Sequence, residues 1–464
     1  MKHFHLVGIG GIGMSAIATL LLKEGFVVSG SDIKESALTD NLLRLGAKIF
    51  IGHNKENLSS SVEAVVFSSA VKEDNPELIE AKVRKISVYR RAEMLSLLMK
   101  GKQTITITGA HGKTTTTALI AYILSQAGLK PTVAIGGLIK NFSMNAWLGE
   151  GDYFVAEADE SDGSFLNFKS HFSIITNIDK EHLDYYGSFD CLLDSFAKFI
   201  DRLEPNGLLI IQNADKNLLR LASNSGKHFK TFGLDRKAHI WADNLKILAF
   251  SCEFDCFLGN KKIGRVYSPL AGIHNVLNCL ASILMGLELG IDFKKIASDI
   301  ADFQGTKRRL DVKFKDKNLM IIDDYAHHPT EIQATLNAIR ESIKLDNSYK
   351  NILAIFQPHR YSRTKLLLEQ FGHCFKSVDQ LVITDIYAAC EQPLAGIDAG
   401  LLCQRIRNIR GNNVFYLERQ NIINHILNHL SGSDVVIFLG AGDITKLADE
   451  FSNVIQAIPR TPKT

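Results

Sequence analysis

The chain has 464 residues and a net charge of only +3, because 53 lysines and arginines nearly balance 50 aspartates and glutamates. At about 150 residues per domain, this length predicts about three domains. The near-neutral balance argues against a nucleic-acid binder, which would carry a basic field. Nine prolines and no biased tract argue against long disordered segments.

The cysteines and the apolar runs indicate the cellular compartment in which the protein is expected. No C-x-x-C pair occurs, so we expect reduced thiols rather than a disulfide framework or a zinc site. The apolar run from Leu6 to Leu22 is broken by glycines, which favours a strand, a turn and a helix over a signal peptide. We therefore expect a soluble, cytoplasmic protein without a membrane span. The cysteines are Cys191, Cys252, Cys256, Cys279, Cys374, Cys390 and Cys403.

The first thirty residues carry a dinucleotide fingerprint. A predicted strand (3–7) leads into G-x-G-x-x-G, then a helix (14–23), a second strand (26–29) and an acid. Such glycines let the backbone approach a pyrophosphate at a helix N-terminus, and the acid can accept hydrogen bonds from a ribose. The pattern predicts nucleotide binding without naming the nucleotide, and an NAD enzyme is the first alternative. The residues of this predicted site are Gly8, Gly10, Gly11, Gly13, Met14, Ser15 and Asp32.

Two further strands, 64–68 and 85–89, are expected in the same sheet. Ser68 and Ser69 close the first of them, where open α/β sheets bind ligands. A plain loop is an equally good interpretation of these two serines.

A second phosphate-binding pattern follows a β-rich run at 103–108. The strict P-loop pattern requires glycine where Ile107 stands, so this is a shortened loop, G-x-x-G-K-T. Its glycines free the backbone to wrap oxyanions, Lys113 can neutralise phosphate charge, and the Thr114 hydroxyl is placed to bind Mg²⁺. The loop residues are Gly109, Ala110, His111, Gly112, Lys113, Thr114 and Thr115. Two nucleotide signatures in one chain favour an enzyme that activates one nucleotide-bearing substrate with another.

Acids and a histidine follow the next two predicted strands. Four carboxylates lie within 157–162, after a strand at 152–156, and favour a metal site over a solvated acidic turn. His182 comes after a strand at 172–176, in the same layer of strand ends as Lys113. We interpret it as functional, although a lone histidine is commonly structural.

The remaining signals are open between two interpretations. Asn275 and Asn278 can either bind an adenine edge or cap the helix that they open. The basic cluster 305–309 is a linker, a phosphate clamp, or both. Strands are expected at 319–322, 351–356, 380–384 and 435–439, and we interpret the glycine turn 440–443 as packing.

Taken together, these motifs resemble the Mur ligases, ATP-dependent enzymes that build the peptidoglycan stem peptide. The segments span almost the whole chain in the family's order. They are GIGGIGMS (8–15), YRRAEML (89–95), TGAHGKTTT (108–116), EADESDGSF (157–165), TNIDKEHLD (176–184), AGIHNVLN (271–278), GTKRRLD (305–311), DDYAHHPTE (323–331), FQPHRYSRT (356–364) and LGAGDI (439–444).

The resemblance implies an α/β fold of three domains. Residues 1–100 would form a Rossmann-like domain for a UDP-sugar, 101–307 a P-loop domain for ATP with a parallel sheet, and 308–464 an α/β domain that closes over ATP and the amino acid. The implied reaction joins L-alanine to the lactyl carboxylate of UDP-N-acetylmuramate through an acyl phosphate, giving ADP and phosphate. The first fingerprint would then hold UDP rather than NAD. A monomer or weak homodimer is expected, with no nucleic-acid or membrane partner.

The resemblance also implies residue roles. Lys113 would hold the phosphates, Thr114 and Glu157 one Mg²⁺, and His182 a second metal. Asn275 would contact adenine, Arg309 the phosphates and Asp324 the ATP ribose. His327, Arg360 and Arg363 would line the amino-acid end, where an arginine fork suits carboxylate or acyl-phosphate oxygens.

Two departures from the family pattern are small-for-small changes: Ala110 stands where threonine is usual, and Ala326 where glycine is usual. Lys198 occupies a place similar to the carbamylated lysine of related ligases. Three alternatives remain: a recycling ligase that joins a tripeptide to the same UDP-sugar, an NAD(P) oxidoreductase, and a non-catalytic nucleotide-binding module. Glu157 and His182 argue against the last, because a mere binder needs no metal bridge.

Overall fold

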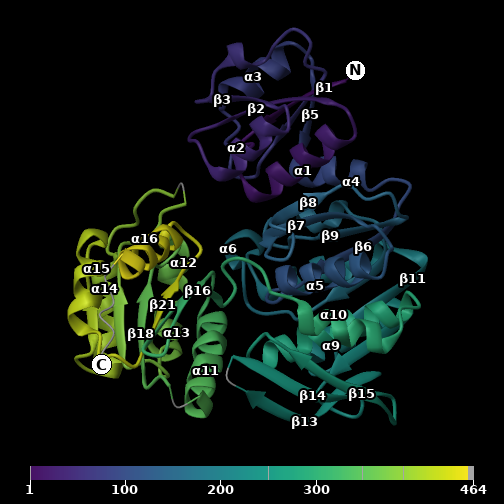
Figure 1. Ribbon diagram of the computed structural model, residues 1–464. Helices are drawn as coiled ribbons and strands as arrows, with labels where there is room; N and C mark the ends of the chain where they lie inside the picture. The colour runs from purple at the N-terminus through teal and green to yellow at the C-terminus, as the bar shows by residue number, and fades with distance from the viewer. Residues whose placement is uncertain (1, 249, 347, 390, 458–464) are drawn as a thin grey trace. The chain divides into compact units, whose positions relative to one another are not determined.

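The computed structural model describes residues 2–248, 250–346, 348–389 and 391–457, so Cys390 lies outside the described residues. Its strands form sheets of five, ten and six strands (Figure 1). The described residues fall into two compact units. The first contains the described residues within 1–243, 255–266 and 277–304, and the second those within 244–254, 267–276 and 305–464. No described helix is long and apolar enough to cross a membrane.

The N-terminal sheet is parallel throughout, in the order β3-β2-β1-β4-β5. The predicted strand 3–7 is confirmed as β1, while β2 runs on to Asp32, so this acid ends the strand rather than following it. Helix α1 is buried along most of its length because it is almost wholly apolar. The elements are β1 (His3–Val7), α1 (Ile12–Lys23), β2 (Val27–Asp32), α2 (Ala37–Arg44), β3 (Lys48–Ile51), η1 (Lys55–Asn57), β4 (Ala64–Phe67), α3 (Pro76–Val83), β5 (Ser87–Arg90) and α4 (Arg91–Leu98).

The central sheet has the order β15-β14-β13-β12-β11-β10-β6-β9-β7-β8. The prediction of a parallel sheet is wrong here, because β7 and β8 pair antiparallel and make the sheet mixed. Strand β6 lies between β10 and β9, and α5 packs against β6, β7 and β9 (Figure 1). The predicted strand 103–108 is confirmed as β6. The first half comprises β6 (Gln103–Thr108), α5 (Lys113–Gln126), β7 (Thr132–Ile139), β8 (Met144–Trp147), β9 (Tyr153–Glu157), η2 (Ser164–Asn167), β10 (Ser170–Ile175), α6 (Leu183–Tyr186) and α7 (Phe189–Asp201).

The second half of this region contains elements that the sequence patterns did not predict. Only its helix α9 was expected. The segment 271–278 was expected to open this helix, which begins at Ile273. The elements are β11 (Leu203–Gln212), α8 (Lys216–Ser225), β12 (Phe229–Gly233), β13 (Ile240–Leu248), β14 (Ser251–Leu258), β15 (Lys261–Ser268), α9 (Ile273–Glu288) and α10 (Phe293–Asp302).

The third sheet has the order β16-β17-β21-β18-β19-β20, with only β16 antiparallel to its neighbour. Its central strands are wholly buried, as apolar parallel strands covered on both faces are. The four predicted strands correspond to β17, β18, β19 and β21. The elements are β16 (Asp311–Lys315), β17 (Leu319–Asp324), α11 (Pro329–Asp346), β18 (Asn351–Phe356), α12 (Tyr361–Leu366), α13 (Leu368–Cys374), β19 (Gln380–Ile383), α14 (Ala399–Arg410), β20 (Val414–Tyr416), α15 (Arg419–His429), β21 (Asp434–Leu439) and α16 (Ile444–Ala457).

Candidate functional site

The P-loop joins β6 to α5, and its two glycines have no room for a side chain. Gly109 has φ 122° and Gly112 has φ 84°, in the region that favours glycine. A Cβ at Gly109 would lie 2.4 Å from Thr176 Oγ1, and one at Gly112 would lie 2.5 Å from Asn278 Oδ1. The loop is therefore enclosed by the end of β10 on one side and by α9 on the other.

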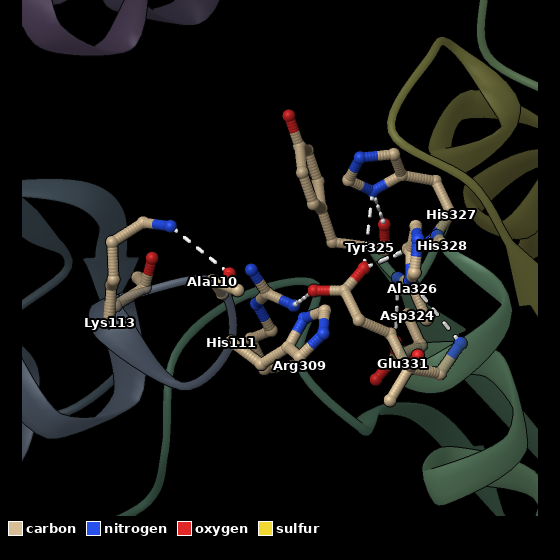
Figure 2. A network of polar contacts seen from close by, with 12 residues as sticks. Ala110, His111, Lys113, Arg309, Asp324, Tyr325, Ala326, His327, His328 and Glu331 are labelled. Atoms are coloured by element: carbon tan, nitrogen blue, oxygen red, sulfur yellow. Dashed lines mark hydrogen bonds and ion pairs between the residues drawn. The ribbon is translucent and has the colours of Figure 1, made fainter. Parts of the chain in front are cut away.

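Lys113 is the first residue of α5, and its ammonium group turns back into the loop. Nζ donates to Gly109 O at 2.6 Å and to Ala110 O at 3.1 Å, as Figure 2 shows for Ala110. It also pairs with the buried Glu160 carboxylate at 2.9 Å. Burial alone would lower the pKa of Lys113, but the charges of Glu160 and Asp159 raise it above its usual value. The lysine is thus a fixed cation at the mouth of the loop.

Thr114 and Glu157 meet beside this lysine. The Thr114 hydroxyl donates to Glu157 Oε1 at 3.1 Å, and Gly136 N donates to Glu157 Oε2 at 3.0 Å. Glu157 is the last residue of β9, which places its carboxylate at the strand end. Burial raises the pKa of Glu157, so a cation beside it would offset the cost of its charge. A hydroxyl and a carboxylate are the oxygen donors that Mg²⁺ prefers.

His182 precedes the short helix α6 in a left-handed conformation, with φ 57°. Its Nε2 lies 3.4 Å from Glu160 Oε1 and 3.4 Å from Glu181 Oε2. Burial would lower the pKa of His182, but the hydrogen bond and charge of Glu160, together with Glu181, raise it. Glu160 therefore lies against both the P-loop lysine and this histidine.

The loop after β10 holds His111 of the P-loop in place. His111 N donates to Asn177 Oδ1 at 2.9 Å, and Asn177 Nδ2 donates back to His111 O at 2.9 Å. The His111 ring contacts Asp179 Oδ2 at 3.0 Å and Glu181 Oε1 at 3.4 Å. The family motif around His182 thus supports the phosphate loop as well as carrying that histidine.

The glycine-rich loop of the N-terminal sheet has the geometry of its fingerprint. Gly10 N donates to Asp32 Oδ2 at 2.8 Å, so the acid supports the loop. Met14 is buried in the core, and Ser15 Oγ donates to Ile12 O at 2.9 Å. Gly8 has φ 77°, and a Cβ there would lie 3.2 Å from Ser68 Cβ.

Residues at the ends of these two sheets differ in exposure. Ser68 is half-buried near Gly8, whereas Ser69 is exposed. Lys198, near the end of α7, is also exposed.

The two candidate asparagines of α9 make different contacts. Asn275, in the second compact unit, turns its Nδ2 back to Ala271 O at 2.8 Å. Asn278, in the first unit, contacts Thr116 Oγ1 at 3.2 Å beside Gly112.

In the second unit, Asp324 ends β17 and is almost fully buried. Its oxygens accept from Leu310 N at 2.6 Å and from Ala326 N at 2.8 Å, and burial raises its pKa to about 6. The backbone at Ala326 does not have a positive φ, so it does not require glycine, and alanine fits where the family usually has glycine. Arg309 lies over the Tyr325 ring at 5.1 Å and pairs with Glu331 Oε1 at 3.5 Å (Figure 2).

A group of rings and arginines lies beside this strand end. His327 Nδ1 is 3.1 Å from Tyr325 O and 3.3 Å from Glu331 Oε2 (Figure 2). Burial and the Arg363 charge lower the pKa of His327 well below its usual range. Arg363 Nη1 donates to His359 Nδ1 at 3.0 Å, and burial with this charge lowers the pKa of His359 to about 3.

Arg360 is the N-cap residue that precedes α12, and its backbone is strained, with φ 72°. Its N–H donates to Tyr387 O at 2.8 Å, which fixes the loop after β18 to the loop after β19. Such strain concentrates at functional sites, in agreement with the role expected for this arginine.

Apart from the glycine-rich loop, the structure gathers most of the residues predicted for ATP, metal and amino acid into one cluster in each unit. Lys113, Thr114, Glu157 and His182 lie together in the first unit, and Arg309, Asp324 and His327 in the second, with Arg363 next to His327 through His359. The sequence patterns missed Glu160, Asn177 and His359 as individual residues, although the motifs quoted for the family contain all three. A carboxylate three residues after Glu157 was the available signal for Glu160.

The sheets, the glycine-rich loop and the P-loop lysine define an α/β enzyme that binds nucleotides. The chain belongs to the Mur ligase family. Residues 3–103 match its domain described as "Mur ligase family, catalytic domain", 107–286 its "Mur ligase middle domain" and 308–442 its "Mur ligase, glutamate ligase domain". The three-domain α/β fold predicted from the sequence is confirmed.

Several relatives cover nearly the whole chain. A UDP-N-acetylmuramate–L-alanine ligase of Aquifex aeolicus (strain VF5) is 45% identical over 451 residues, 97% of either chain. One of Trichlorobacter lovleyi is 44% identical over 446 residues, 96% of this chain and 97% of its own. The crystal structure of UDP-N-acetylmuramate-alanine ligase MurC from Thermotoga maritima is 30% identical with a TM-score of 0.85, covering 99% of this chain and 100% of that one.

A murein peptide ligase from Psychrobacter arcticus 273-4 also shares the fold. It is 22% identical with a TM-score of 0.72, covering 99% of this chain and 100% of that one. At this identity the likeness shows the fold alone.

Proposed function

We propose that the chain ligates L-alanine to UDP-N-acetylmuramate at the expense of ATP, in the synthesis of peptidoglycan precursors. The lactyl carboxylate attacks the γ-phosphate of ATP, and ADP leaves. The amine of alanine then attacks the carbonyl carbon of the acyl phosphate, an amide bond forms and phosphate leaves. The whole-length identity of 45% to a ligase with this name supports the choice of substrates.

The observation that carries the ATP-dependent step is the convergence of Lys113, Thr114 and Glu157 around the carboxyl ends of β6 and β9, which lie at one edge of the central sheet. Phosphoryl transfer depends on positioning and charge neutralisation more than on covalent catalysis by the protein. The Lys113 ammonium would exchange its loop carbonyls for phosphate oxygens. The N-terminus of α5 adds free backbone N–H donors for the same group.

The donor set at this edge fits Mg²⁺. Thr114 and Glu157 would hold one ion. His182 would serve a second metal position. Bound there, the metal would neutralise charge on the phosphates. Gly136 N donates to the Glu157 carboxylate and so orients it independently of any ion.

The residues of the second unit would bind the other end of ATP and the amino acid. Asp324 has its carboxylate fixed by two backbone N–H groups and would accept hydrogen bonds from the ribose. Asn275 and Arg309 are proposed for adenine and phosphate. His327 is held neutral, so it can stand beside the ammonium group of alanine without repelling it. Arg360 and Arg363 would bind carboxylate or acyl-phosphate oxygens.

Phosphate release with a panel of acceptors tests the proposal. With UDP-N-acetylmuramate and ATP, L-alanine should support release, and a stem tripeptide should not. Release with the tripeptide but not with alanine would assign the recycling activity instead. Tight NADH binding without ATP binding would overturn the ligase assignment altogether.

The domain boundaries near residues 100 and 307, a cytoplasmic location and a monomeric or weakly dimeric state complete the proposal. The location follows from the use of ATP and a UDP-sugar, which are substrates of the cytoplasm. Light scattering of the purified chain would test the oligomeric state directly.

A further inference from the structure

Glu391, in the loop after β19, caps the first turn of α12. Ser362, the second residue of α12, donates its backbone N–H to Glu391 Oε2 at 3.0 Å and its hydroxyl to Oε1 at 2.6 Å. The N-cap residue Arg360 supplies no side-chain cap of its own. Both oxygens of one carboxylate are therefore engaged by one serine at the start of the helix, where a negative charge also suits the helix dipole.

The same loop is bonded to the segment that precedes α12. Arg360 N donates to Tyr387 O, and Tyr387 N donates to Pro358 O, each at 2.8 Å. The ring of Tyr387 stacks on the ring of His359, with centroids 5.6 Å apart and planes inclined by 12°. The loop after β19 therefore holds both the approach to α12 and its first turn.

Both sides of this contact contain strained backbone. Arg360 has φ 72°, and Ala389, two residues before Glu391, has φ 47°, in the left-handed region that side chains other than glycine rarely adopt. Such conformations persist only where the surrounding structure holds them. The pair of carboxylate and serine is one contact that does so, because it joins the two strained segments.

The two arginines proposed for the amino acid flank this serine. Arg360 lies two residues before Ser362, and Arg363 follows it directly. Arg363 Nη1 also donates to His359 Nδ1 at 3.0 Å, so it is tied to the segment that Tyr387 covers. A shift of the first turn of α12 would displace both guanidinium groups at once. Recognition of a carboxylate by arginine depends on the placement of its planar donors, so such a shift would weaken it.

We propose that Glu391 is a positioning residue, which through Ser362 holds the two arginines in place for the carboxylate of the amino acid. The inference rests on the proposed function and adds to it a residue that does not itself touch the substrate. Alanine at position 391 removes both bonds to Ser362. Glutamine can keep both, because its oxygen accepts from the backbone N–H and its amide group donates to the hydroxyl.

Initial rates of phosphate release by the full chain, measured against L-alanine at saturating ATP and UDP-N-acetylmuramate, test this role. Glu391→Ala should raise KM for L-alanine by about tenfold to a hundredfold, the loss expected when hydrogen bonds to a charged group are removed. Its KM for ATP should be unchanged, and its kcat at saturating alanine should be close to that of the wild type. Glu391→Gln should recover most of the affinity. Glu369→Ala, at an exposed position on α13, is the control.

A purely structural role for Glu391 predicts a different pattern. Partial loss of the fold would lower kcat through the fraction of active enzyme and leave KM for L-alanine unchanged. That pattern in Glu391→Ala, or a Glu391→Gln variant as impaired in KM as Glu391→Ala, would overturn the inference. If Glu391→Ala does not fold, Ser362→Ala replaces it and should raise KM for L-alanine by a smaller factor, because only the hydroxyl bond is lost. A wild-type chain that releases no phosphate with L-alanine would contradict the proposed function itself, whereas an active wild type with an unchanged KM in the variants would contradict the inference alone.

Discussion

The ammonium of Lys113 lies 2.9 Å from the carboxylate of Glu160, so the P-loop cation is paired with an acid of its own domain. Glu160 is only 2% exposed and also lies 3.4 Å from His182. Phosphate oxygens that bind Lys113 must therefore compete with a buried carboxylate. We therefore expect the charge of Glu160 to weaken nucleotide binding.

Replacing Glu160 with glutamine should tighten ATP binding severalfold when no metal is present. The substitution keeps the shape of the side chain and removes the charge that competes with the phosphates. Titration with ATP in a chelating buffer measures the effect, with the exposed Glu56→Gln as the control. Weaker ATP binding in Glu160→Gln would show that the carboxylate assists the nucleotide rather than competing with it.

Lys113→Ala should lower turnover by about a hundredfold to a thousandfold, because the lost charge acts on the transferring phosphoryl group. UDP binding should be unchanged, since the glycine-rich loop lies in a different sheet. Steady-state phosphate release and UDP titration together measure the two effects. Lys100→Ala, at an exposed position, is the control. Wild-type turnover in Lys113→Ala would remove this lysine from the mechanism.

Gly112→Ala should destabilise the protein more than Gly128→Ala does. The two glycines have similar φ values, 84° and 77°, but only a Cβ at Gly112 meets another atom, Asn278 Oδ1 at 2.5 Å. The backbone penalty is therefore shared, and the clash should add about 1–3 kcal/mol. Urea unfolding of both variants measures the difference. Equal losses would mean that Asn278 moves away without cost.

The buried Glu77 should make stability depend on acid. Burial would raise its pKa, but His5, 3.6 Å away, together with hydrogen bonds from Ser31 and Asn57, lowers it to about 2, from an ordinary value of 4.5. A carboxyl with a depressed pKa stabilises the fold above its ordinary value and loses this contribution as the pH falls toward 2. The shift corresponds to about 3 kcal/mol.

Thermal unfolding of the wild type and Glu77→Gln at pH 6 and at pH 3 tests this. The wild type should melt higher at pH 6, and the gap should narrow at pH 3. Glu73→Gln is the control, because Glu73 is exposed and lies just before α3, the helix that contains Glu77. This variant should melt like the wild type at both pH values. A gap that is independent of pH would mean that Glu77 acts only through its shape.

The strands and loops with strong local signals could be predicted from the sequence. Gly109, Gly112 and Lys113 follow a β-rich run, and this order of residues specifies a phosphate loop wherever the strand lies. The pattern around 157–162 shows the limit, because four carboxylates share one short segment and only the fold turns Glu160 toward Lys113.

Asn275 and Asn278 show the same limit on a helix. They lie three residues apart, close to one turn, and either could be assigned to the nucleotide from the sequence. The packing of α9 decides that Asn278 lies beside Gly112. Strands β11 to β15 were not predicted, because their mixed polar and apolar residues carry no motif and gain their order from neighbours in the sheet.

Mass spectrometry of the products tests the central claim most directly. The chain is incubated with UDP-N-acetylmuramate, ATP, Mg²⁺ and an equimolar mixture of amino acids. The account predicts UDP-N-acetylmuramoyl-L-alanine as the main new species, with ADP and phosphate formed in equal amounts. ADP formation without any amide product, or an amide with a different amino acid in place of alanine, would contradict it.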